Sequence, residues 1–72
     1  MSGLQGETGH ESAAARRAEL QRMMPSLLDL IDQMDAYEQR FVTDMNDQLV
    51  LNAEWVPTPK QLFKARDINV KY

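Results

Sequence analysis

The feature that most constrains this chain is a 25-residue stretch, from Leu27 to Leu51, that contains neither glycine nor proline. Apolar residues recur through it at a spacing of seven, as in Leu27, Met34 and Phe41, with others at the intermediate positions. This spacing predicts one continuous amphipathic helix with a heptad seam, which favours left-handed pairing of helices. At about 1.5 Å per residue, such a helix would be roughly 37 Å long.

A helix of this length must bury its apolar side along its whole run, and two short flanking helices would cover only part of it. The chain has 72 residues and no cysteine, so disulfides and thiolate metal sites are excluded. Small domains of this kind often depend on a partner chain. The sequence therefore predicts an all-α fold that forms a homodimer with coiled-coil-like packing, or that pairs with an unlike chain of a larger assembly. The predicted seam consists of Leu20, Leu27, Leu30, Met34, Tyr37 and Phe41.

The segments before this stretch predict a tail and a first helix. Residues 1–10 contain all three glycines and are expected to be disordered. The alanine-rich run that follows favours a helix over residues 11–23. Pro25 is expected to cause a break or a kink after this helix, because proline has no N–H and disfavours helical dihedrals in the preceding residue. Ser26 is then expected to cap the long helix of residues 27–51, within a single domain of residues 11–72.

The C-terminal stretch WVPTPKQ has the features of a linker that leads into a capped helix. Thr58 is a good N-cap, and Pro59 suits the first helical position, where its missing N–H costs nothing. Gln61 completes a T-x-x-Q capping box. The pattern predicts a third helix over residues 59–69. Trp55 lies in the linker, where it either packs between the second and third helices or serves as an anchor for a partner.

The acidic residues are concentrated in the middle of the chain. Residues 26–54 hold seven of them against Arg40 alone, a net charge of −6 within an overall net charge of −3. Four of these acids recur every third residue and are expected to form an exposed ribbon beside the seam. This ribbon is interpreted as a solvated surface or as a docking surface for a basic partner, rather than as a metal or catalytic site. Its members are Asp29, Asp32, Asp35 and Glu38.

The basic residues at the C-terminal end give residues 55–72 a net charge of +3, from four cations against Asp67. Two roles are open for them. They could attract the acidic middle within one fold, or they could contact nucleic acid phosphates. The cations are Lys60, Lys64, Arg66 and Lys71.

Several function classes find no support in the sequence. The single histidine, His10, cannot form a metal cluster alone, and no glycine-rich phosphate loop is present, so no cofactor, metal or catalytic residue is predicted. The chain is expected not to be an enzyme. No signal sequence or membrane span is recognisable, and a cytoplasmic protein is expected.

Residues 37–72 resemble a segment of small bacteriophage-encoded accessory proteins. The shared features are the stretch YEQRFV from Tyr37, the "TPKQ" helix start at Thr58, and the terminal Ile68 with Lys71 and Tyr72. The resemblance implies a phage protein that acts in the host cytoplasm by binding a host machine or by assisting phage DNA metabolism.

These observations predict a small protein-interaction module, such as a phage-encoded inhibitor or adaptor, that binds a host complex through the acidic ribbon with Trp55 as anchor. The alternatives are a nucleic-acid-associated accessory protein that uses the basic C-terminal helix, and a small subunit of a larger assembly.

Overall fold

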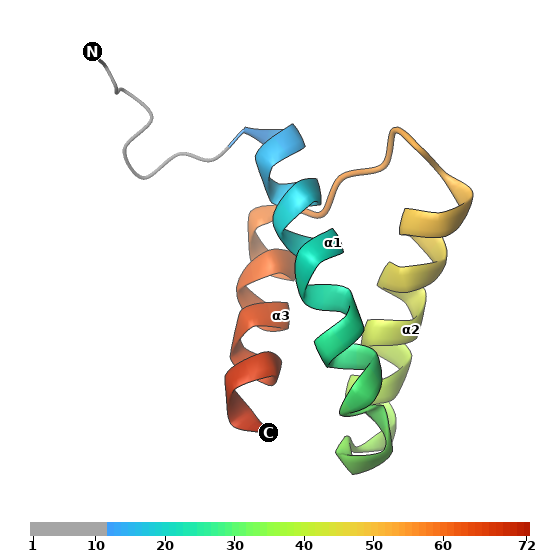
Figure 1. Ribbon diagram of the computed structural model, residues 1–72, viewed down its shortest axis with the longest axis vertical. Coiled ribbons are helices and arrows are strands. Elements are labelled where there is room, and N and C mark those ends of the chain that lie inside the picture. The colour runs from blue at the N-terminus through green and yellow to red at the C-terminus, as the bar shows by residue number, and fades with distance from the viewer. Residues whose placement is uncertain (1–11) are drawn as a thin grey trace.

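The computed structural model describes residues 12–72, which form three α-helices and one short 3-10 turn, with no strand in this range. The elements are α1 (Ala13–Asp29), η1 (Ile31–Gln33), α2 (Ala36–Leu51) and α3 (Pro59–Lys71). The chain turns back after α1 and again after α2, and α1 packs against both other helices (Figure 1). The predicted all-α class is confirmed. The predictions for residues 1–11, including the tail and His10, lie outside the described residues.

The first helix runs through Pro25 to Asp29, so its predicted end at residue 23 is wrong. Helix α1 begins at the N-cap Ser12, whose hydroxyl accepts a hydrogen bond from Ala15 N at 3.1 Å. Pro25 is exposed, whereas Met24 and Leu27 on either side of it are buried. Proline costs a helix interior about 3 kcal/mol. Burial of a leucine or methionine side chain contributes about 1.5–3 kcal/mol each, so two such residues offset the proline.

The predicted continuous helix over residues 27–51 is also wrong, because the chain breaks between Leu30 and Asp35. Leu30 N donates to Ser26 O at 3.2 Å and to Leu27 O at 3.1 Å, which closes the end of α1. Met34 is extended, with φ −86° and ψ 156°. Ser26 is therefore a residue of α1 and not a cap.

A capping box that the sequence interpretation missed starts α2. Glu38 N donates to Asp35 Oδ1 at 2.8 Å, and Asp35 N donates to Glu38 Oε1 at 3.2 Å. The Gln39 side chain supports the break by donating to Ile31 O at 2.9 Å and to Met34 O at 3.3 Å. These bonds satisfy backbone groups that a continuous helix would have paired internally. They make the break favourable within a run of good helix formers.

The break lets the apolar seam fold onto itself. Leu20, Leu27 and Met34 are buried in the core of one chain. Leu30 and Phe41 are partly buried against that core, while Tyr37 is 65% exposed. Five of the six predicted seam residues thus lie in or against the core of one chain, and Tyr37 is the exception. The core residues are Leu20, Met24, Leu27, Met34, Val42, Met45, Leu62, Ala65 and Ile68.

The start of α3 is as predicted. Gln61 N donates to Thr58 Oγ1 at 3.1 Å, and Thr58 N donates to Gln61 Oε1 at 2.9 Å. Pro59 occupies the first turn, and the helix extends two residues beyond the predicted end, to Lys71. Leu62, Ala65 and Ile68 form its buried side.

Candidate functional site

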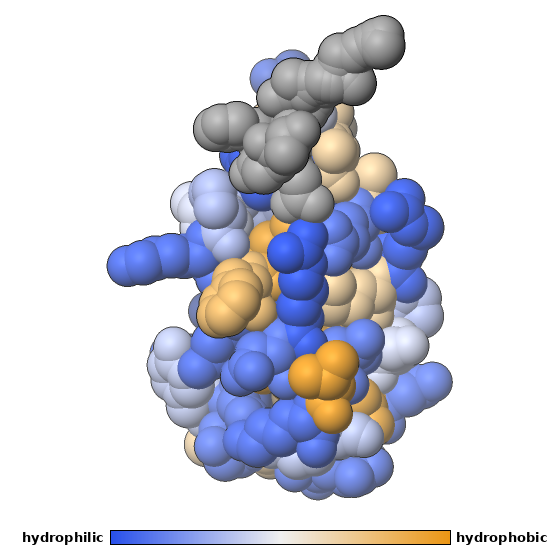
Figure 2. Space-filling model, turned by 90° about the vertical axis from the view of Figure 1, so that its left-hand side faces the viewer, coloured by the Kyte–Doolittle hydropathy of each residue, from blue (hydrophilic) through white to orange (hydrophobic). Residues whose placement is uncertain are grey.

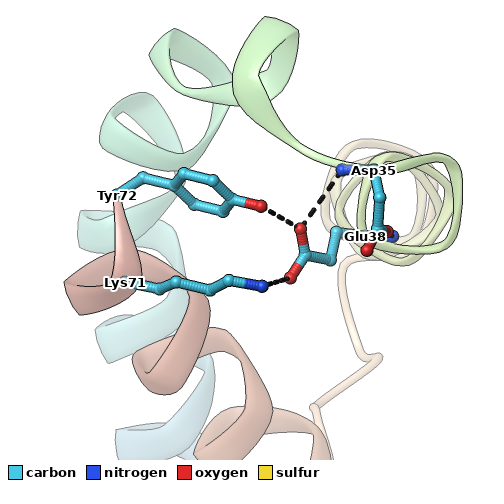
Figure 3. Close-up of polar contacts among 4 residues, drawn as sticks. All are labelled: Asp35, Glu38, Lys71 and Tyr72. Atoms are coloured by element: carbon cyan, nitrogen blue, oxygen red, sulfur yellow. Dashed lines mark hydrogen bonds and ion pairs between the residues drawn. The ribbon is translucent and has the colours of Figure 1, made fainter.

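Glu38 is a buried link between two helices and not a member of an exposed ribbon. The residue is only 5% exposed. Lys71 Nζ lies 2.8 Å from Glu38 Oε2, and the Tyr72 hydroxyl donates to Oε1, which also accepts from Asp35 N (Figure 3). The hydrogen bonds from Lys71 and then Tyr72 lower the pKa of Glu38 to about 2. The same contact with Glu38 raises the pKa of Lys71 and the pKa of Tyr72.

The other three acids of the predicted ribbon are exposed, but they do not share one helix face. Asp29 is the last residue of α1, Asp32 lies in η1, and Asp35 is the N-cap of α2. The three-residue repeat therefore crosses a helix end, a turn and a cap. These carboxylates surround the turn between α1 and α2.

Three of the four cations proposed for nucleic acid contacts interact within the fold. Arg66 Nε and Nη2 donate to the two carboxylate oxygens of Glu19 at 2.6 and 2.7 Å, and this hydrogen bonding lowers the pKa of Glu19. Lys64 Nζ lies 5.0 Å from the centre of the Tyr37 ring. Lys71 is held by Glu38, which leaves Lys60 as an exposed cation in the first turn of α3.

The linker around Trp55 is held by arginines whose role the sequence interpretation missed. Arg17 Nη1 donates to Asn52 O at 3.0 Å and to Trp55 O at 2.6 Å, while Nη2 donates to Leu49 O at 3.0 Å. Arg16 Nε donates to Pro57 O at 2.8 Å. Helix α2 has no basic residue in its last turn, so Arg17 of α1 supplies the positive charge that favours this negative helix end. Helix α1 also has no basic residue in its last turn, so this feature of the sequence does not by itself predict the contact with Arg17.

Trp55 lies in the linker between α2 and α3, and its role as an anchor for a partner stays a prediction. Its side chain is partly buried and packs against the core, as the structural interpretation expected. It also lines an open pocket of about 210 Å³ between α2 and the start of α3. The other residues of this pocket, called here the Trp55 pocket, are Phe41, Asp44, Met45, Gln48 and Gln61.

The surface of α2 and its flanking turns remains strongly acidic after the internal contacts are formed. Six carboxylates from residues 29–54 are exposed, while Arg40 is the one basic residue in that range. Asp44 is both a member of this acidic surface and a residue of the Trp55 pocket. The six are Asp29, Asp32, Asp35, Asp44, Asp47 and Glu54.

Residues 12–72 contain no group of three or more histidine, cysteine or acidic side chains placed to hold a metal ion. Within the same range, no helix has the length and apolar character needed to cross a membrane. Comparisons with protein-family models, curated proteins and solved structures found no match to this chain.

Proposed function

We propose that the protein is a small protein-interaction module that binds a basic partner at its acidic surface, with a lysine or arginine side chain of the partner in the Trp55 pocket. The observation that carries this proposal is the position of Asp44 beside two aromatic side chains, Phe41 and Trp55, within that surface.

The composition of the pocket suits a cation on an apolar stem. A cation near an aromatic face is attracted by the ring, and a carboxylate adds a charge-assisted hydrogen bond. Met45 can pack against the methylene groups of the stem, since methionine adapts to irregular gaps. The pocket volume of about 210 Å³ is below the roughly 300–1,000 Å³ typical of small-molecule sites, which favours a single side chain as the occupant.

The surrounding acids add attraction over a longer range. A surface dominated by one sign of charge raises the association rate of an oppositely charged partner and suppresses binding of acidic ones. Because this attraction is screened over about 8 Å at physiological salt, binding should weaken as salt is added. Support for binding rather than catalysis comes from the openness of the pocket and from its one carboxylate, which has no second acid or base within the pocket.

Titration with a capped octalysine peptide at low salt tests this proposal, with octaglutamate as the control peptide. Trp55 is the only tryptophan, so its fluorescence reports on the pocket directly. We expect a saturable change with octalysine and none with octaglutamate. Asp44→Asn should weaken octalysine binding about tenfold, a change of about 1.4 kcal/mol. Asp47→Asn, which removes the same charge from α2 outside the pocket, should weaken it much less. Equal effects of the two variants would contradict a role for the pocket.

The resemblance to phage accessory proteins adds a narrower proposal, that the partner belongs to a host protein complex that the protein inhibits or recruits. Nucleic acid binding has less support, because Lys64, Arg66 and Lys71 have contacts inside the fold. A salt titration against single- and double-stranded DNA separates the two ideas, because phosphate contacts give a steep loss of affinity with salt.

A further inference from the structure

Two large apolar side chains of α3 lie outside the core. Phe63 is 70% exposed and Val70 is 80% exposed. They are seven residues apart, so they lie on the same side of the helix, two turns from each other. Arg66 and Asp67 lie between them and line a shallow depression together with them. Figure 2 shows the side of the molecule on which α3 lies, with separate hydrophobic patches in a mainly hydrophilic surface.

The order of these residues is complementary to itself. From the N-terminal side the outer stripe of α3 runs apolar, positive, negative, apolar, as Phe63, Arg66, Asp67 and Val70. A two-fold axis between Arg66 and Asp67 places Phe63 of one chain opposite Val70 of another. It also places Arg66 opposite Asp67 in both directions. Such a reciprocal arrangement is the defining property of an isologous dimer interface.

We propose that the outer stripe of α3 pairs in an antiparallel manner with the same stripe of a second copy of the chain. Arg66 keeps its contact with Glu19 in this arrangement, because a guanidinium group has five N–H donors and can serve two carboxylates. The occupant is a second copy rather than an unrelated partner because the charges and the apolar groups match their own two-fold image. In this proposal the homodimer forms through α3, because most of the heptad seam packs in or against the core of one chain.

A single pair of 13-residue helices buries little surface, so this dimer is weak and depends on concentration. Sedimentation velocity of the full chain at increasing concentration is expected to show a monomer that converts to a dimer. Val70→Lys and Asp67→Lys should each raise the dissociation constant about tenfold or more. Val50→Lys is the matched control, since Val50 is 73% exposed on α2 and its replacement should leave dimerisation unchanged. A chain that stays monomeric at millimolar concentration, or a Val50 variant that dissociates as readily, overturns the proposal.

The direction of pairing can be tested separately because the chain has no cysteine. Phe63→Cys and Val70→Cys variants are mixed under oxidising conditions. Antiparallel pairing brings position 63 next to position 70 of the other copy, within the short Cα separation that a disulfide needs, so the mixed disulfide should dominate. Two copies of the same variant hold their cysteines two turns apart and should link slowly. Dominant links between identical variants would contradict the proposed geometry. The sedimentation and disulfide experiments do not involve the Trp55 pocket. Their results therefore do not depend on whether the pocket binds a peptide.

Discussion

Two helix starts in this molecule use the same capping box but differ in how far their side chains reach. At the start of α3, Thr58 and Gln61 exchange hydrogen bonds with each other's backbone. At the start of α2, Asp35 and Glu38 do the same, but Glu38 also binds Lys71 and Tyr72 at the end of α3. The first box involves only neighbouring residues. The second also connects Glu38 to Lys71 and Tyr72, which lie 33 and 34 positions further along the chain. A capping motif can therefore hold tertiary structure when its acid is buried.

This difference explains which helix start could be predicted. The box at Thr58 follows a proline-containing linker and has proline at the first helical position, so local chemistry alone identifies it. The box at Asp35 lies inside a heptad pattern that continues on both sides of it. The spacing of apolar residues indicates which residues are buried. The same spacing is found when the chain breaks into two helices that pack against each other. The break at residues 30–35 is therefore hidden from an argument based on spacing.

Contacts between residues far apart in the sequence could not be predicted either. Arg17 binds carbonyls 32–38 residues away, and nothing near Arg17 in the sequence indicates this. The all-α class, the helical character of both flanking segments and the position of α3 follow from composition and local motifs. The prediction of a helix end before Pro25 was wrong because it considered only the cost of proline inside a helix. It did not include the burial of Met24 and Leu27 beside it.

The largest expected effect comes from removing the buried acid. Glu38→Ala deletes a cap and both contacts to the end of α3, and it leaves Lys71 without its partner. We expect a loss of stability several times larger than that of Gln61→Ala, which removes only a local bond and costs about 0.5 kcal/mol. Urea unfolding followed by circular dichroism measures both. Similar losses would show that the two boxes are equivalent and that the tertiary contacts of Glu38 add nothing.

Pro25→Ala tests whether the proline lies within a helix. Alanine restores an N–H inside α1 and removes the proline ring, so we expect stabilisation by up to about 3 kcal/mol. The urea midpoint should rise with no change in the slope. If Pro25 instead lay at a helix boundary, as the sequence suggested, the variant would be neutral or destabilised.

Replacement of the two N-cap residues is expected to give smaller losses of stability that are similar to each other. Thr58→Ala and Asp35→Ala each remove one side-chain acceptor at a helix start, and each should cost about 1 kcal/mol. Differential scanning calorimetry can measure both. A much larger loss for Asp35→Ala would indicate that the cap also fixes the position of Glu38.

The contact between Glu38 and Lys71 also makes stability depend on pH. The pKa of Glu38 is lowered from 4.5 to about 2, so its contribution is present above about pH 4.5 and is lost as the pH falls towards 2. The raised pKa values of Lys71 and Tyr72 mean that their contributions are present below about pH 10 and are lost as the pH rises further. Glu38→Gln should lack the part of the acid-side loss that comes from Glu38, while the part that comes from the lowered pKa of Glu19 remains. Urea midpoints measured from pH 2 to 7 for both proteins check this, and parallel curves would contradict it.

The most direct test of the role of Glu38 is an NMR titration of its side-chain carboxyl carbon in the unchanged protein and in the Lys71→Met variant. If Glu38 ties the start of α2 to the end of α3, its carboxyl group should titrate near pH 2. In the Lys71→Met variant, the carboxyl group of Glu38 should titrate at a higher pH. A Glu38 signal that titrates near the ordinary value of 4.5, unaffected by Lys71→Met, would contradict the account.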